Sequence, residues 1–378
     1  MKAWVLHGAN DLRREEVERP VLEAGEVRIL VKAAGICGSD IPRIYQTGAH
    51  THPLIPGHEF SGMVEALGSG VDPVWLGRRV GVFPLIPCGQ CMPCQKQQYE
   101  MCRHYSYLGS RRNGGFGEYA AVPVWNLLLL PDCVKFEEAA MLEPMAVAVH
   151  AMRRAVPSPS DTVVVCGLGP IGLLLVMFLK EAGVSEILAI GNKDTQRQMY
   201  ERLGLPQDTY CDSRLTDVSG WLWERTKGHG ADVFFECVGR KETYEMAVTH
   251  AAPSGRVMLV GNPHSDMSLS KEIYWKILRN QLTVSGTWNS SFLHDPGDDW
   301  HYVLKRMEEK RIAPSDLITH RFCPEDLEKG LQIMKNKTED YGKIMSVDGT
   351  GLKKGIFPKL VEIKLLSNGK TWYNKHEF

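Results

Sequence analysis

The stretch VVVCGLGPIG, Val163–Gly172, decides the fold of this chain. A β-branched run ends at a glycine, two further glycines complete the G-x-G-x-x-G spacing, and an apolar helical run follows directly. In a strand–turn–helix unit this spacing indicates a dinucleotide site, with the phosphates at the helix N-terminus. The alternative is a purely structural strand-to-helix turn. The residues expected to bind the coenzyme here are Gly167, Gly169, Pro170, Ile171 and Gly172.

Short apolar runs alternate with helical stretches from Asp161 onward. Strand-like runs lie at 162–166, 186–190, 208–211, 231–235, 256–260 and 282–286. Such alternation predicts a parallel sheet with crossover helices, and six strands complete a doubly wound α/β fold. We therefore expect a Rossmann coenzyme-binding domain over residues 156–291.

The residues before this unit read as a β-rich domain that ends in a helix. Strands are expected at 27–33, 60–67, 79–82 and 125–130, and a helix at 137–153. After residue 291, helices at 298–310 and 324–336 surround a strand at 317–321, with a closing strand at 343–347. We expect this last segment to return to the first domain. Residues 348–378 form a tail beyond the needs of the fold, either a genuine extension or non-native sequence.

The composition is that of a globular protein, with 43% hydrophobic and 24% charged residues. A formal net charge of -1 argues against nucleic acid or an anionic membrane as partner. No apolar run approaches the roughly 20 residues that span a bilayer, and no secretory signal is evident. The ten cysteines are therefore expected in a reducing compartment, the cytoplasm.

Four of these cysteines form a C-x2-C-x2-C-x7-C cluster, namely Cys88, Cys91, Cys94 and Cys102. Four thiolates can surround one Zn²⁺ ion and leave no open position, which predicts a structural zinc site. An iron–sulfur cluster or a disulfide pair is the alternative.

A second group of possible metal ligands is dispersed along the chain. Cys37 lies in GICGSD (35–40), His58 and Glu59 in GHEFSG (57–62), and Glu143 in MLEPMA (141–146). Cysteine, histidine and glutamate together suit a catalytic Zn²⁺ ion. Taken singly, each also fits an ordinary role, as a core thiol, a loop histidine or a helix carboxylate.

These motifs, together with the four-cysteine loop, GGFGEY (114–119) and GLGPIG (167–172), occur in an order that resembles the zinc-dependent medium-chain alcohol and polyol dehydrogenases. The resemblance runs from Met1 to about Val347. It implies a GroES-like catalytic domain, residues 1–155 and 292–347, that is interrupted by the coenzyme domain. It also implies a homo-oligomer, a dimer or a tetramer.

The resemblance implies two zinc ions per chain and a role for each matching residue. Cys37, His58 and Glu143 would hold the catalytic zinc, and Glu59 would be an alternative ligand. Ser39 would hydrogen-bond the reacting hydroxyl. Zinc favours the deprotonated alcohol, from which hydride passes to the nicotinamide. A zinc-free reductase or a non-catalytic binding protein on this scaffold is disfavoured, because such relatives lack these ligands.

The likeness extends to dehydrogenases of polyol phosphates such as galactitol 1-phosphate, through CGSDIPRI (37–44), GSRRNGGFGEY (109–119) and LTVSGTWNSS (282–291). Arginines offer paired contacts to a phosphate, although surface arginines are usually solvated. The alternative substrate is an unphosphorylated polyol such as sorbitol or xylitol. The candidate substrate residues are Arg43, His50, Arg111, Arg112 and Asn289.

NADP is the favoured coenzyme, because Gly191 occupies the position where NAD sites usually carry an acid. Asn192 and Lys193 follow and suit a 2′-phosphate. An inward turn of Asp194 would keep NAD usable. Residues at three later strand ends are expected to line the nicotinamide pocket, unless they are simple turns: Val238, Val260, Gly286 and Thr287.

Overall fold

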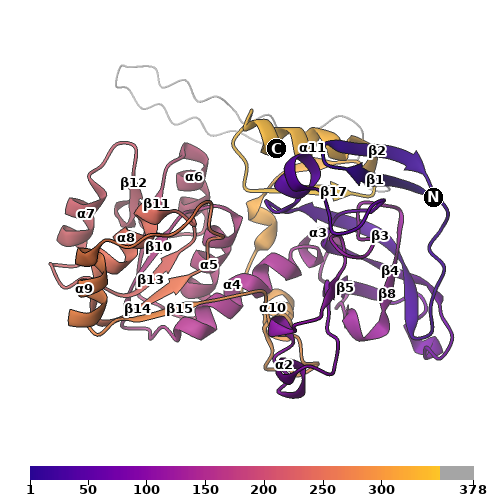
Figure 1. Cartoon of the computed structure of the whole chain (residues 1–378), viewed down its shortest axis with the longest axis horizontal. Helices are drawn as coiled ribbons and strands as arrows, with labels where there is room; N and C mark the ends of the chain where they lie inside the picture. The colour runs from indigo at the N-terminus through magenta and orange to yellow at the C-terminus, as the bar shows by residue number, and fades with distance from the viewer. Residues whose placement is uncertain (350–378) are drawn as a thin grey trace, which may run out of the picture. The chain divides into compact units, whose positions relative to one another are not determined.

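The computed structural model describes residues 1–349, and its coenzyme-domain strands form one parallel sheet (Figure 1). The strand order is β12–β11–β10–β13–β14–β15, which is the doubly wound order. The predicted α/β fold class is therefore confirmed. The strands are β10 (Thr162–Cys166), β11 (Glu186–Gly191), β12 (Tyr210–Asp212), β13 (Ala231–Glu236), β14 (Ala251–Leu259) and β15 (Thr283–Gly286).

Helices cover both faces of this sheet. Alternate side chains of a strand point to opposite faces, and the buried strands carry apolar side chains on both, so each face packs against helices. Val163 and Val165 pack into a core that includes α4 and α5, whereas Val164 and Cys166 pack with residues of α7 and α8. The helices are α4 (Leu142–Ala155), α5 (Pro170–Glu181), α6 (Asp194–Arg202), α7 (Val218–Arg225), α8 (Lys241–His250) and α9 (Lys271–Arg279).

A second, seven-stranded sheet carries the catalytic motifs. Its order is β16–β17–β3–β4–β5–β9, and β8 also pairs with β3. β17 lies antiparallel to β3, so the C-terminal strand joins the sheet of the N-terminal segment. The strands are β3 (Glu26–Ile36), β4 (Glu59–Leu67), β5 (Arg79–Val82), β8 (Tyr119–Pro123), β9 (Leu127–Leu129), β16 (Ile318–Phe322) and β17 (Lys343–Val347). β1 (Lys2–Gly8) and β2 (Asp11–Glu16) form a separate hairpin, and β6 (Leu85–Ile86) pairs with β7 (Ser106–Tyr107).

The single helix expected over 137–153 is two helices, α3 (Phe136–Ala139) and α4. Pro144 explains the break, because a proline ring inside a helix clashes with the carbonyl four residues earlier, here that of Ala140. Starting α4 at Leu142 puts Pro144 in its first turn, where proline is tolerated. The break also places Glu143 at the start of α4.

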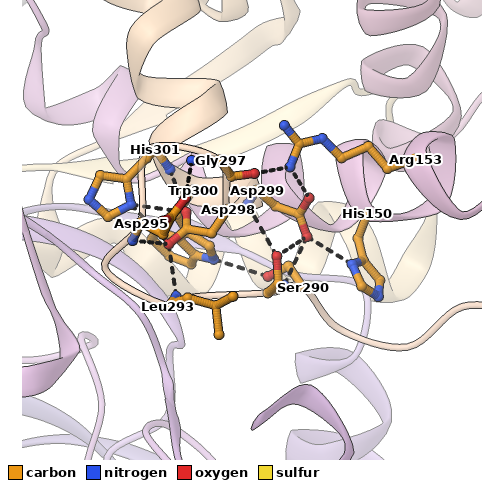
Figure 2. Close-up of polar contacts among 11 residues, drawn as sticks. His150, Arg153, Ser290, Leu293, Asp295, Gly297, Asp298, Asp299, Trp300 and His301 are labelled. Atoms are coloured by element: carbon orange, nitrogen blue, oxygen red, sulfur yellow. Dashed lines mark hydrogen bonds and ion pairs between the residues drawn. The ribbon is translucent and has the colours of Figure 1, made fainter. Parts of the chain in front are cut away.

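Polar contacts tie the chain after β15 to α4 (Figure 2). Asp299, in the first turn of α10 (Asp299–Glu308), is buried and accepts hydrogen bonds from the Ser291 amide and hydroxyl, both at 2.8 Å. Its carboxylate also lies 2.8 Å from His150 Nδ1 and 3.0 Å from Arg153 Nη1, both on α4. Burial raises the pKa of Asp299, but the hydrogen bond from His150 and its other partners outweigh burial and lower the pKa.

The last described helix, α11 (Leu327–Asn336), precedes β17 and packs on the catalytic sheet. Within residues 1–349, no helix has both the length and the apolar content needed to cross a membrane. From residue 350, the expected tail of 348–378 lies outside the described residues.

Candidate active site

Cys37, His58 and Glu59 lie together between two neighbouring strands of the catalytic sheet. Cys37 follows β3 and Glu59 opens β4, and the antiparallel register sets Gly35 opposite Glu59. One ligand atom from each of the three residues lies within 4.8 Å of the others. His58 and Glu59 are buried, and Cys37 is half-buried. Sulfur, imidazole nitrogen and carboxylate oxygen are ligands that Zn²⁺ accepts, so this donor set fits a catalytic zinc ion.

The buried carboxylate of Asp40 contacts two of these ligand residues, Cys37 and His58. It accepts hydrogen bonds from the Cys37 amide at 3.0 Å and from Arg43 Nη1 at 2.6 Å. The Asp40 carboxylate also lies 3.5 Å from His58 Nδ1, close enough for an ion pair. Among the described residues, His58 Nδ1 has no hydrogen-bond partner. Burial raises the pKa of Asp40, but His58 and Arg43 outweigh it and lower the pKa. Ser39 Oγ donates to Cys37 Sγ at 3.3 Å.

Glu143 is buried near this cluster. Its carboxylate oxygens, however, do not lie within 4.8 Å of all three ligand atoms of Cys37, His58 and Glu59. Its Oε1 accepts a hydrogen bond from Tyr107 Oη at 3.1 Å. Burial raises the pKa of Glu143 to about 7, against the opposing effect of His58. The Tyr107 ring lies 5.8 Å from the His58 ring. Tyr107 was not singled out from the sequence, because nothing in its local pattern separates it from a core tyrosine.

Lys343, at the start of β17, is a second residue that the sequence analysis missed. Its ammonium group forms an ion pair with Glu59 Oε2 and donates to the carbonyl of Ile36 at 3.1 Å. Burial lowers the pKa of Lys343, but Glu59 and Cys37 outweigh burial and raise it. A buried cation therefore faces the negatively charged ligands.

The four cysteines of the loop also converge. Sγ of Cys91 lies 3.5 Å from that of Cys94 and 3.8 Å from that of Cys102, and Sγ of Cys88 lies 4.0 Å from that of Cys94. A disulfide needs about 2.05 Å, whereas a tetrahedron of Zn–S bonds of about 2.3 Å places sulfurs about 3.8 Å apart. Backbone amides, chiefly that of Arg103, lower the pKa of Cys91 to about 6, which favours the thiolate that binds metal.

Two glycines of the turn after β10 lie too close to neighbouring atoms for a side chain to fit without a shift. Gly167 has φ +96°, and a Cβ there would meet Val238 Cγ2 at 2.5 Å. A Cβ on Gly172 would collide with the carbonyl oxygen of Gly167. Gly169 caps α5 and has open space before it, followed by Pro170 and Ile171 in the first turn. This leaves the free amides at the helix N-terminus accessible to an anion.

Gly191 ends β11 against two polar side chains. A Cβ there would meet Tyr210 Oη at 2.5 Å and Gln196 Oε1 at 2.8 Å, so a side chain at this position would displace one or both of these groups. The amide of Asn192 donates to Gln196 Oε1 at 2.9 Å.

Two cations flank this strand end. Lys193 Nζ lies 2.9 Å from Asp340, and Arg214 lies 2.5 Å from both Asp194 and Asp212. Asp194 is mostly exposed on its side-chain surface, at 79%. Arg214 was not predicted, because it becomes a neighbour of Gly191 only when β12 pairs with β11.

The expected nicotinamide residues follow three adjacent strands. The amide of Val238 donates to Glu236 Oε1, and that of Val260 to the Glu236 carbonyl, each at 2.8 Å. Glu236 is a buried carboxylate that the sequence analysis missed. Gly286 ends β15, and the amide of Thr287 donates to the Leu259 carbonyl at 3.1 Å. Thr287 Oγ1 is buried without a hydrogen-bond partner in the described part of the chain, so a donor is left for a ligand.

The remaining substrate candidates do not contact the zinc ligands through any hydrogen bond or ion pair within residues 1–349. Arg112 pairs with Glu26 at 2.5 Å. The guanidinium of Arg111 lies over the Tyr105 ring, 4.6 Å from its centre. His50 is exposed. Asn289 has φ +57°, and its Oδ1 accepts from the next amide at 3.0 Å.

Two family models match the chain in tandem. The alcohol dehydrogenase GroES-like domain matches residues 23–132, and the zinc-binding dehydrogenase model matches residues 170–309. Galactitol 1-phosphate 5-dehydrogenase of Escherichia coli strain K12 is 35% identical over 309 residues, 81% of this chain and 88% of that protein. The chain belongs to the zinc-binding alcohol dehydrogenase family. This confirms the resemblance drawn from the motifs and the enzyme class, an NAD(P)-dependent zinc alcohol or polyol dehydrogenase that acts on CH–OH groups.

Other members of the family differ in substrate and coenzyme. L-threonine 3-dehydrogenase of Bacillus subtilis is 30% identical over 85% of this chain and 91% of its own. The crystal structure of galactitol-1-phosphate dehydrogenase from Escherichia coli is 32% identical, with a TM-score of 0.85 over 92% of this chain and 100% of that one.

Two further solved structures, each with a TM-score of 0.83 over 92% of this chain, hold a coenzyme. An alcohol dehydrogenase of Escherichia coli CFT073, 30% identical with 99% of its chain covered, was solved with NADH. A putative zinc-binding dehydrogenase of Sinorhizobium meliloti 1021, 26% identical with 98% covered, was solved with NADP. Family membership therefore leaves the coenzyme of this chain open.

Proposed function

We propose that this enzyme oxidises a secondary hydroxyl of a polyol phosphate related to galactitol 1-phosphate. The observation that carries the proposal is the buried donor set of Cys37, His58 and Glu59, with Glu143 beside it. A zinc ion bound there would supply a Lewis acid that lowers the pKa of a coordinated alcohol. Ser39, whose hydroxyl donates to the Cys37 sulfur, would contact the substrate hydroxyl; its position next to the ligand Cys37 supports this role.

Arg111 is the favoured phosphate ligand among the predicted arginines. Arg43 and Arg112 are held by carboxylates, whereas Arg111 makes no ion pair within the described residues. Its guanidinium stacks on Tyr105, whose ring lies 6.2 Å from that of Tyr107, the partner of Glu143. The Arg111 guanidinium, which forms no ion pair within the described residues, is therefore linked to the candidate metal site through the rings of Tyr105 and Tyr107. This arrangement suits a substrate with an alcohol at one end and a phosphate at the other.

A panel of polyols and polyol phosphates tests this proposal. The initial rate of coenzyme reduction would be measured for galactitol 1-phosphate, sorbitol 6-phosphate, galactitol, sorbitol and xylitol. We expect kcat/KM for a phosphorylated polyol to exceed that for its unphosphorylated counterpart by at least about tenfold, the effect of one charge-assisted contact. Equal values, or higher values for the free polyol, would assign the enzyme to the unphosphorylated alternative.

NADP is the coenzyme that we propose. Support comes from Gly191, which leaves this strand end without an acid, and from Lys193 and Arg214 beside it, whose ion pairs with Asp340 and Asp194 are partly exposed and so can be exchanged for a 2′-phosphate. The Arg214→Gln variant should lose about tenfold in kcat/KM for NADP while retaining that for NAD. Arg202→Gln, an exposed arginine at the end of α6, is the matched control. A wild-type enzyme that prefers NAD would overturn this part of the proposal.

Zinc content separates the enzyme from a zinc-free reductase or a binding protein. We propose two zinc ions per chain, one at the four-cysteine loop and one at the catalytic donor set. Elemental analysis of the purified chain should give a ratio near two, falling to one in the Cys37→Ala variant. A ratio of one in the wild type would leave only the structural site.

We further propose a cytoplasmic homo-oligomer that associates through β15. This strand ends the coenzyme sheet, and its neighbour α9 exposes Tyr274, Trp275 and Leu278. Unpaired strand edges and exposed apolar side chains favour self-association. Light scattering should show a dimer or a tetramer, and Trp275→Lys should shift it towards the monomer.

A further inference from the structure

Lys343 is the only lysine that is buried in residues 1–349, with 3% of its surface exposed. Burying an ammonium group is unfavourable unless a nearby anion compensates for the lost hydration. Here the compensation comes from Glu59, one of the candidate metal ligands, and from the Ile36 carbonyl. The positive charge of Lys343 therefore lies next to a carboxylate that is also expected to bind a metal ion.

The charges around this lysine explain why it is tolerated. When the thiol and both carboxyl groups are ionised, Cys37, Glu59 and Glu143 carry three negative charges. A zinc ion supplies two positive charges, and Lys343 supplies the third. Asp40 does not enter this balance, because Arg43 already pairs with it.

The packing around Gly35 keeps this ion pair in place. A Cβ on Gly35 would collide with Glu59 Oε2 and would lie 2.9 Å from Lys343 Cε. A larger residue at this point of β3 would therefore displace the ends of both side chains. Because β17 pairs with β3 beside it, the backbone itself brings Lys343 to Glu59.

We propose that Lys343 is a positioning residue that competes with the catalytic zinc ion for the Glu59 carboxylate. By holding Glu59, Lys343 keeps it a displaceable ligand and leaves a coordination position for the substrate. This inference rests on the catalytic zinc site of the proposed function. It adds a residue from the far end of the chain to that site.

The test compares Lys343→Met, Lys343→Arg and the exposed control Lys329→Met on α11. Each chain would be assayed for zinc content, for the rate of zinc release to a chelator, and for its visible spectrum with Co²⁺ at the catalytic site. Freed from Lys343, Glu59 should bind the metal permanently. Lys343→Met should therefore change the cobalt spectrum, slow the release of catalytic zinc about tenfold, and lower kcat more than it changes KM.

Lys343→Arg keeps the cation and should retain the wild-type spectrum and release rate, as should Lys329→Met. A folded Lys343→Met chain with wild-type spectrum and release rate would overturn the inference. If that variant does not fold, slower zinc release in Lys343→Arg would overturn it equally. A wild-type chain with only one zinc ion would instead show that the proposed catalytic site is absent, whatever Lys343 does.

Discussion

The ammonium group of Lys193 lies 2.9 Å from the carboxylate of Asp340, so the end of β11, where we propose that the coenzyme ribose binds, is tied to the segment before β17. Asp340 also accepts a hydrogen bond from Thr195 Oγ1 at 2.9 Å. A coenzyme 2′-phosphate would bring a second anion to the same lysine. With NADP bound as we propose, Asp340 and the phosphate would compete for Lys193.

This competition makes Asp340→Asn a test of the coenzyme site. The substitution removes a negative charge near the expected phosphate and frees Lys193, so kcat/KM for NADP should rise about threefold relative to that for NAD. Steady-state kinetics with both coenzymes measures the ratio. A fall in NADP preference would mean that Asp340 instead orients Lys193 towards the phosphate.

Arg111→Gln tests the phosphate end of the substrate site. Loss of the guanidinium should raise KM for a polyol phosphate at least about tenfold, because a hydrogen bond to a charged group contributes about 1.5–3 kcal/mol. KM for an unphosphorylated polyol should stay unchanged. Arg103→Gln, another exposed arginine near the cysteine loop, controls for general loss of surface charge. Parallel increases for both substrates would point to damage of the loop rather than to lost phosphate binding.

Asp299→Asn tests the contacts between α10 and α4. Because the folded-state pKa of Asp299 is lowered, its ionised form stabilises the fold above the unfolded pKa of about 3.9, and this stability is lost as pH falls through the folded value. The variant should be less stable by about 2 kcal/mol at pH 7. The difference should shrink below pH 4. Urea unfolding at both pH values measures it, and a pH-independent difference would contradict the assignment to ionised Asp299.

Cys91→Ser tests the four-cysteine loop. A serine cannot replace a zinc thiolate, so the variant should lose one zinc ion per chain and have a lower Tm. The catalytic zinc should remain, which cobalt substitution at that site would show. Retention of both ions would argue against tetrahedral cysteine coordination, and Cys133→Ser, an exposed cysteine outside the loop, is the control.

The strands and helices that could be predicted from the sequence are those marked by a local pattern of apolar residues. The apolar runs that became β10, β11 and β13 could be predicted, because a parallel strand that is covered on both faces is apolar on both. The helix break before Glu143 was missed, since periodicity across Ala139–Met145 hid the constraint that Pro144 imposes.

The missed site residues share a different cause. Lys343 and Arg214 are ordinary charged residues in sequence, and only the pairing of β17 with β3 and of β12 with β11 brings them to their sites. Tyr107 likewise reaches Glu143 from a segment 36 residues away. Such tertiary neighbours leave no periodic signal in a single sequence.

The close approach of Tyr210 to Gly191 constrains which side chains position 191 could accept. Introducing an acid at position 191 would drive its first carbon into the tyrosine hydroxyl, which donates to the Lys193 carbonyl at 3.1 Å. A single substitution would therefore disturb the strand end before it could bind a ribose. If NADP is the coenzyme, as we propose, a change to NAD would combine an acid at position 191 with a smaller residue at position 210.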